Sequence, residues 1–125
     1  MKITTFNPMI LSKDSESTIE LFKELGFEKR HAPVTTVETG DEVQCTRMKD
    51  SNGFYVDIAD LPQMPQDTTY IRMNVDNFEE AYEILKKHGF TNTRGDGTID
   101  TKSATAATMV SPSGFRISLI KHIKK

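Results

Sequence analysis

The feature that most constrains this chain is an internal repeat. Residues 14–27 can be laid over residues 77–90 without a gap. Five positions carry the same residue in both segments, namely Glu16/Glu79, Glu20/Glu83, Lys23/Lys86, Gly26/Gly89 and Phe27/Phe90. A second stretch, 50–58, matches 111–119 in the same order along the chain. We therefore predict one domain, 1–125, built from two similar halves at about 1–61 and 68–125.

The first matched segment predicts a helix that ends at a glycine in each half. Asp14 is a good N-cap for the first helix, and Asn77 or Asp76 serves the second. Gly26 and Gly89 supply the left-handed residue at which each helix stops. Apolar residues recur at helical spacing and predict the buried faces, which are Ile19, Phe22 and Leu25 in the first helix and Phe78, Ala81, Ile84 and Leu85 in the second.

The second matched stretch predicts a strand that follows a turn. Residues 54–58 alternate with a period of two, so Phe54, Val56 and Ile58 share one face while Tyr55 and Asp57 share the other. Residues 115–119 and 69–75 alternate in the same way, and residues 95–102 form a polar loop that contains glycine. The predicted order is β-α-β-β-β, followed by the same order again.

Composition and charge exclude several classes of partner. The net charge is −2, and no basic stripe with interleaved aromatic residues is present, so we expect no nucleic acid. Neither a signal peptide nor an apolar run near the ~20 residues of a membrane span is found, so we expect no membrane partner. The single cysteine, Cys45, fits a reducing, cytoplasmic compartment and is expected as a buried strand residue.

The duplicated β-α-β-β-β order resembles the glyoxalase/bleomycin-resistance/dioxygenase superfamily, also called the vicinal-oxygen-chelate superfamily. The resemblance rests on Asp14…Leu25-Gly26-Phe27 and on Ser111-Pro112-Ser113-Gly114-Phe115, and it covers nearly the whole chain. It implies an α+β fold in which two βαβββ modules form curled half-barrel sheets around a cleft, with the helices outside. It also implies a homodimer, because many members of the superfamily are dimeric.

The resemblance also implies where a metal would bind. Metal-dependent members hold a divalent ion with ligands from four strands, typically two His and two Glu. The corresponding positions in this sequence are Asn7, Asp57, Tyr70 and Ser118. One carboxylate with an amide and two hydroxyl groups would hold such an ion poorly, and we expect His31, His88 and His122 at the surface. We therefore expect no metal and no other cofactor.

Alternation along the strands adds Met9, Tyr55, Arg72, Asn74 and Arg116 to the inner face. Two interpretations of this polar face stay open. In the first, Asp57 pairs with Arg72 or Arg116 in a partly buried network. In the second, the arginines receive a carboxylate or phosphate while the tyrosines stack on an organic ligand.

Three functions are compatible with these residues, and the missing metal ligands favour the first. It is a metal-free protein that binds a small organic anion or an antibiotic in the cleft through Asn7, Met9, Tyr55, Arg72, Asn74, Arg116 and Ser118. The cationic character of the face suits bleomycin itself poorly. The second function is that of a lyase, isomerase or transferase with Asp57 or Tyr70 as general base. The third is an interaction domain with a vestigial cleft.

Overall fold

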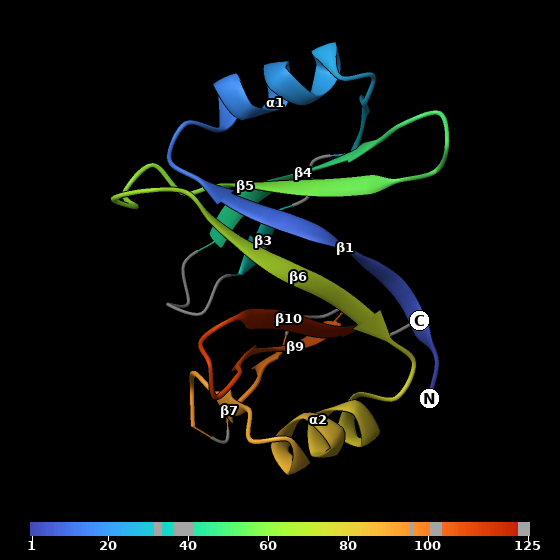
Figure 1. Cartoon of the computed structure of the whole chain (residues 1–125), viewed down its shortest axis with the longest axis vertical. Helices are drawn as coiled ribbons and strands as arrows, with labels where there is room; N and C mark the ends of the chain where they lie inside the picture. Colours follow the sequence, from blue (N-terminus) through green and yellow to red (C-terminus); the bar gives the residue numbers. More distant parts are fainter. Residues whose placement is uncertain (32–33, 37–41, 96, 101–103, 123–125) are drawn as a thin grey trace. The chain divides into compact units, whose positions relative to one another are not determined.

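The computed structural model describes residues 1–31, 34–36, 42–95, 97–100 and 104–122, and its chain divides into two compact units (Figure 1). The first, called the α1 unit, comprises Asn7–Thr69. The second, called the α2 unit, comprises Met1–Phe6 together with Tyr70–Lys125. Among the described residues, no helix has the length and apolar character that a membrane span requires.

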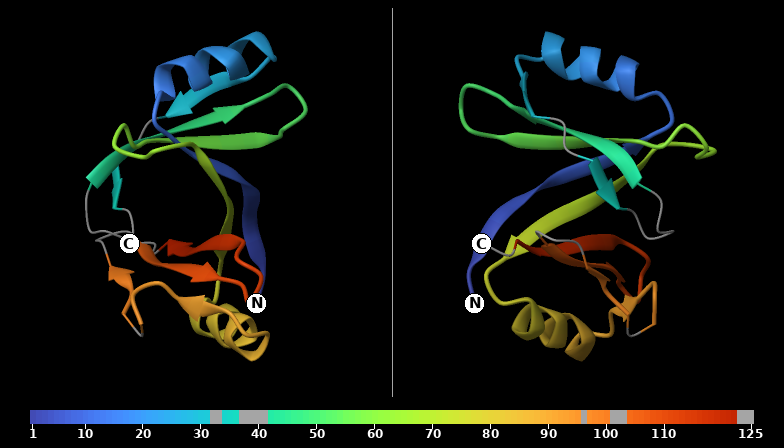
Figure 2. Two further views of the ribbon diagram at one scale, coloured as in Figure 1. Left: turned by 60° about the vertical axis from the view of Figure 1, so that its left-hand side comes forward. Right: turned by 180° about the vertical axis from the view of Figure 1, so that it is seen from behind.

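The α1 unit is a sheet with a helix on one face. Its elements are β1 (Ile3–Ser12, of which residues from Asn7 onward belong here), α1 (Ser15–Glu24), β2 (Glu28–His31), β3 (Val34–Thr36), β4 (Glu42–Lys49) and β5 (Tyr55–Asp60). The strands lie in the order β2-β4-β5-β1, and β3 also pairs with β4. β1 runs parallel to β5, whereas β4 is antiparallel to its partners. α1 runs along one face of this sheet in every view (Figure 2).

The α2 unit repeats this topology. Its elements are β6 (Thr68–Val75, of which residues from Tyr70 onward belong here), α2 (Phe78–Lys87), β7 (Thr91–Asn92), β8 (Ile99–Asp100), β9 (Ala104–Val110) and β10 (Arg116–His122). The strands lie in the order β7-β9-β10-β6, with β6 parallel to β10, and β8 also pairs with β9. The predicted β-α-β-β-β order is confirmed in both halves, with one difference. The strand after each helix is split into two short strands, β2 and β3 pairing with β4 in one unit and β7 and β8 pairing with β9 in the other.

The segment predicted as a loop at residues 95–102 differs from that prediction in part. Ile99 and Asp100 form the short strand β8 and pair with Ala106 and Thr105 of β9. A two-residue strand within a polar segment leaves no alternating pattern long enough to be recognised. Residues 96, 101 and 102 lie outside the described residues.

The two helices begin with the same capping geometry. The Asp14 side chain accepts a hydrogen bond from the Ser17 amide at 3.3 Å, and Asn77 accepts one from the Glu80 amide at 3.1 Å. Asn77, and not Asp76, is therefore the second cap. The hydroxyl of Ser17 also donates to Asp14, and this bond, followed by that from the Ser17 amide, lowers the pKa of the Asp14 carboxyl.

The helix ends are equally similar. Phe27 donates its amide to the Phe22 carbonyl at 2.9 Å, and Phe90 donates to the Leu85 carbonyl at 3.0 Å. The intervening Gly26 and Gly89 have φ values of 104° and 89°, which lie in the left-handed region that glycine adopts without steric cost. The sequence repeat thus reflects two helices that start and stop by the same local hydrogen bonds.

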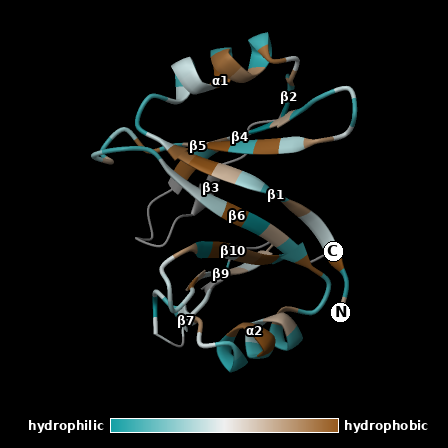
Figure 3. Cartoon of the chain, in the orientation of Figure 1, coloured by the Kyte–Doolittle hydropathy of each residue, from teal (hydrophilic) through white to brown (hydrophobic). Residues whose placement is uncertain are grey.

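Each unit buries its own apolar layer between its helix and its sheet. In the α1 unit, the buried residues Met48, Val56 and Ile58 contact a layer that includes Ile19 and Phe22 of α1. In the α2 unit, the cluster contains Met73, Val75, Phe78, Ala81, Ala107, Met109, Ile117 and Leu119. Both helices therefore show hydrophobic and hydrophilic segments side by side, as Figure 3 makes visible. Cys45 is buried in β4, as predicted.

Two apolar residues assigned to buried helix faces, Leu25 and Ile84, are exposed instead, and Phe54 is exposed as well. Leu25 is the C-cap of α1, so it lies beyond the last turn that packs on the sheet. Phe54 precedes β5, which begins at Tyr55, and belongs to the turn before that strand. Ile84 lies beside the α2 stripe that runs through Phe78 and Ala81.

The first six residues belong to the α2 unit, which differs from the boundary expected between the halves. The Lys2 amide donates to the Asp76 side chain at 2.6 Å, and the Asp76 amide donates to the Lys2 carbonyl at 3.0 Å. The terminal amino group of Met1 lies 3.1 Å from Glu80. These bonds join the start of the chain to the segment that enters α2. That the two units form one domain stays a prediction.

Candidate functional site

The helix-free face of the α1 unit gathers four of the predicted site residues. Val56 and Ile58 point toward α1, so Tyr55 and Asp57 lie on the opposite face of β5. Met9 of β1 is paired with Asp57 in register, and Asn7 lies two residues earlier on the same face. The structure therefore brings Asn7, Met9, Tyr55 and Asp57 together, as the resemblance and the alternation along the strands predicted.

Asp57 is the centre of a buried polar network on this face. Its side chain is 0% exposed, and one carboxylate oxygen accepts a hydrogen bond from Asn7 Nδ2 at 2.7 Å. Arg47 Nη1 lies 3.2 Å from the same oxygen and 3.4 Å from the other. The Arg47 guanidinium also lies 4.1 Å from the centre of the Tyr55 ring, a cation–π distance. Asp57 is thus an ion-paired carboxylate.

Sequence reasoning missed Arg47. It pairs with Asp57 because β4 and β5 are neighbours with Arg47 directly opposite Asp57. The sequence alone shows an alternating segment that contains Arg47, but it does not show the register between β4 and β5. The predicted pairing of Asp57 with Arg72 or Arg116 stays a prediction.

Asn7 contributes a buried acceptor that lacks a hydrogen-bond donor. Its Nδ2 group donates to Asp57 and to the Pro8 carbonyl at 2.9 Å. Both of these neighbours are acceptors, so the amide nitrogen must face them and the oxygen must face away. Asn7 is 5% exposed, and among the described residues its Oδ1 atom has no partner. Because buried acceptors in proteins are normally hydrogen-bonded, we expect a water molecule or a ligand to donate to this oxygen.

The helix-free face of the α2 unit gathers the other five predicted residues, which are Tyr70, Arg72, Asn74, Arg116 and Ser118. Met73, Val75, Ile117 and Leu119 form the core beneath α2, so their alternate neighbours occupy the opposite face. Ser118 is paired in register with Arg72 of β6 and with Thr108 of β9. Thr108, which the sequence analysis did not select, therefore lies on the same face.

The cationic groups of this second face are held by polar and aromatic neighbours. Arg72 Nε donates to Asn74 Oδ1 at 3.3 Å, and the Arg116 guanidinium lies 5.7 Å from the centre of the Tyr70 ring. Tyr70 and Asn74 are buried, whereas both arginines are half-buried. This face therefore carries two guanidinium groups, that of Arg72 on β6 and that of Arg116 on β10.

The residues at the superfamily's metal positions do not fit a divalent ion. Asp57 is the single carboxylate among them, and the Arg47 guanidinium contacts both of its oxygens. A second cation placed there would be repelled by the first. Within the described part of the chain, no three His, Cys, Asp or Glu side chains are grouped to hold a metal. His88 and His122 are exposed, as expected, and the His31 side chain lies outside the described side chains.

Comparison with known proteins gives a match in structure but not in sequence. No family model matches the chain, and no curated protein is similar to it in sequence. Methylmalonyl-CoA epimerase from Mycobacterium tuberculosis superposes with a TM-score of 0.72 at 10% identity, covering 98% of this chain and 90% of its own. The Streptomyces coelicolor methylmalonyl-CoA epimerase gives 0.67 at 15% identity, covering 98% and 100%.

A glyoxalase I variant from Zea mays is also similar, with a TM-score of 0.68 at 15% identity. The superposition covers 98% of this chain and 44% of the maize chain, so the present chain spans less than half of that protein. These similarities extend over almost every residue and match the duplicated topology described above. The chain therefore has the glyoxalase-like fold of the vicinal-oxygen-chelate superfamily, to which both of these enzymes belong.

Proposed function

We propose that this protein binds a small organic anion and that the helix-free face of the α2 unit receives the anionic group. One observation carries the proposal: the half-buried Arg72 and Arg116 lie on one face together with Ser118, which is paired in register with Arg72. Half-buried guanidinium groups in such a setting favour a carboxylate or a phosphate, because each can donate two parallel hydrogen bonds to it.

The neighbouring side chains suit the same ligand. Ser118 and Thr108 are opposite each other and next to Arg72 in register, so their hydroxyls can donate to further oxygens of the anion. Tyr70 adds aromatic surface beside Arg116, against which an organic body can pack. The proposed ligand is therefore an anion with an organic part.

The test measures binding to the two arginines. Protein purified without a histidine tag is titrated by calorimetry with benzoate, succinate and inorganic phosphate, with Arg72→Ala and Arg116→Ala as variants. Each substitution should weaken binding of the responsive anion by about tenfold or more, because a charge-assisted hydrogen bond contributes ~1.5–3 kcal/mol.

Arg30→Ala is the matched control, since Arg30 is an exposed residue of β2 and its loss changes the net charge equally. It should leave the affinity unchanged. Unaltered affinity in both Arg72→Ala and Arg116→Ala, together with a loss of several kcal/mol of stability, would show that the arginines are structural and would refute the proposal.

An enzymatic function is the second candidate, because two of the structurally similar proteins are named methylmalonyl-CoA epimerases. The candidate general bases are Asp57 and Tyr70. Incubation with methylmalonyl-CoA in deuterated water should then exchange the proton next to the carbonyl, as followed by NMR, and Asp57→Asn or Tyr70→Phe should abolish the exchange. The absence of exchange in the unmodified protein would contradict this candidate for that substrate.

We propose a cytoplasmic homodimer whose ligand is a metabolite-like anion or an antibiotic, and we keep an interaction domain as the remaining alternative. Elemental analysis of the purified protein tests the expected lack of metal, and stoichiometric zinc, nickel, manganese or iron would overturn it.

A further inference from the structure

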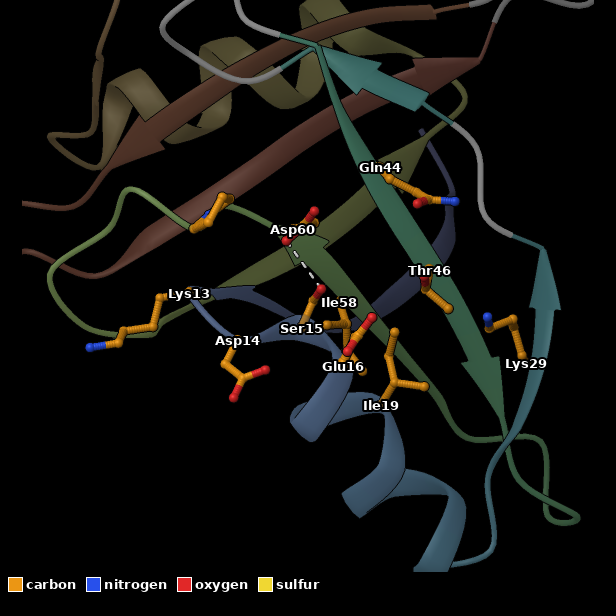
Figure 4. Close-up of a pocket in the computed structure, with 11 residues that line it drawn as sticks. Lys13, Asp14, Ser15, Glu16, Ile19, Lys29, Gln44, Thr46, Ile58 and Asp60 are labelled. Atoms are coloured by element: carbon orange, nitrogen blue, oxygen red, sulfur yellow. Dashed lines mark hydrogen bonds between the residues drawn. The ribbon is translucent and has the colours of Figure 1, made fainter.

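A hollow lies in the α1 unit between α1 and the sheet, on the side opposite the helix-free face (Figure 4). Its volume is about 420 Å³, which is within the range of small-molecule sites. Ile19 of α1 and Ile58 of β5 supply its apolar lining. The hollow is separate from the helix-free faces, because Ile58 points toward α1 whereas Asp57 points away from it.

Thr46 is the unusual residue in this hollow. Thr46 of β4 is paired in register with Ile58 of β5, which is itself paired with Ile10 of β1. Thr46 therefore lies on the apolar face of the sheet that packs beneath α1. It is only 5% exposed, yet among the described residues its hydroxyl has no hydrogen-bond partner. The hydroxyl borders the hollow, where it can donate to or accept from a group that enters.

Acidic, basic and polar side chains line the hollow. Glu16 of α1 and Asp60 of β5 lie on one side, and Lys29 of β2 and Gln44 of β4 lie on the other, with Thr46 on the latter side (Figure 4). Asp60 accepts a hydrogen bond from the Ser15 hydroxyl at 3.1 Å. Glu16, Lys29 and Gln44 have no side-chain partner within the described part of the chain.

We infer that this hollow binds a free α-amino acid as a zwitterion. The ammonium group of the ligand faces Glu16 and Asp60, and the carboxylate faces Lys29, Gln44 and the Thr46 hydroxyl. A short side chain packs on Ile19 and Ile58. The ligand thereby bonds to the Thr46 hydroxyl and pairs both signs of charge at once.

The α2 unit provides an internal comparison. A hollow of about 390 Å³ lies at the start of α2, lined by Asn77, Phe78 and Glu79, which correspond to Asp14, Ser15 and Glu16 in the repeat. The fold therefore produces a hollow beside each helix start. The chemistry differs, because Phe78 occupies the place of Ser15 and Asp76 is already bonded to Lys2. The inference rests on the side chains of the α1 unit and not on the hollow alone.

The test is a calorimetric and NMR titration of the whole chain with alanine, serine and valine as probes. Two analogues, alanine amide and N-acetylalanine, each lack one charge of the zwitterion. We expect saturable binding of at least one amino acid, and both analogues should bind about tenfold more weakly or worse. Amide shifts in the NMR spectrum should appear at Thr46 and Lys29.

Three variants locate the site. Thr46→Val keeps the shape of the side chain and removes the hydroxyl, and Lys29→Met removes the charge; each should weaken binding about tenfold. Lys23→Met is the matched control, because Lys23 is an exposed lysine of α1 outside the hollow, and it should bind as the unmodified chain does.

The inference is overturned if no amino acid binds at millimolar concentration, if both analogues bind as well as alanine, or if Thr46→Val and Lys29→Met leave affinity unchanged. It does not depend on the proposed anion site. Arg72→Ala should not alter amino-acid binding, so the two proposals can fail separately.

Discussion

Replacing Arg47 by methionine should lower the free energy of unfolding by about 3–5 kcal/mol, the usual result of removing one partner of a buried ion pair. Methionine keeps most of the apolar stem and removes the guanidinium, which lies 3.2 Å from the fully buried Asp57 carboxylate. The cost arises because the carboxylate remains in a low-dielectric environment without that cation. Chemical denaturation followed by circular dichroism measures the change.

A double variant separates charge from packing. Asp57→Asn removes the negative charge, so combining it with Arg47→Met should restore a substantial part of the lost stability. Arg30→Met, at an exposed position of β2, should change stability by no more than about 0.5 kcal/mol. If Arg47→Met is equally mild, other groups neutralise Asp57, and the pair is not the principal support of this face.

Leu119→Ala should lower the free energy of unfolding by about 2–5 kcal/mol. Leu119 is 0% exposed in β10 and belongs to the cluster beneath α2, where it is paired in register with Met73 of β6. Truncation removes apolar surface from the core and leaves a void that its close-packed neighbours fill only in part. Denaturant unfolding with a fixed m-value measures the loss.

Leu21→Ala is the control for this prediction, because Leu21 is an exposed leucine of α1. The same chemical change should cost about 0.5 kcal/mol or less there. Equal losses in the two variants would contradict the assignment of Leu119 to the core of the α2 unit.

The sequence predicted the duplicated topology because the signals involved are local. N-caps, glycine stops and the turn before each matched strand act within a few residues, so they recur wherever the local sequence recurs. The turns at Asp50 and Ser111 show this, since each residue's side chain accepts hydrogen bonds from the amides that lead into the next strand. The period of two then assigned Tyr55 and Asp57 to one face correctly.

Features that depend on pairing between distant segments could not be predicted in this way. Arg47 meets Asp57 only because β4 and β5 align in one particular register. Thr46 likewise comes to lie opposite Ile58 only through the register between β4 and β5. Leu25 was assigned to a buried face because apolar spacing continues past the end of the helix, where packing stops.

The bonds between Lys2 and Asp76 have a consequence for the order of folding. The two residues are 74 positions apart, and the bonds that join them complete the α2 unit. On the ribosome, which releases the chain from its N-terminus, the α1 unit, ending at Thr69, has all of its residues before Asp76 and the rest of the α2 unit emerge. Closing a chain segment of that length carries an entropic cost, which makes docking of the N-terminal segment a late step.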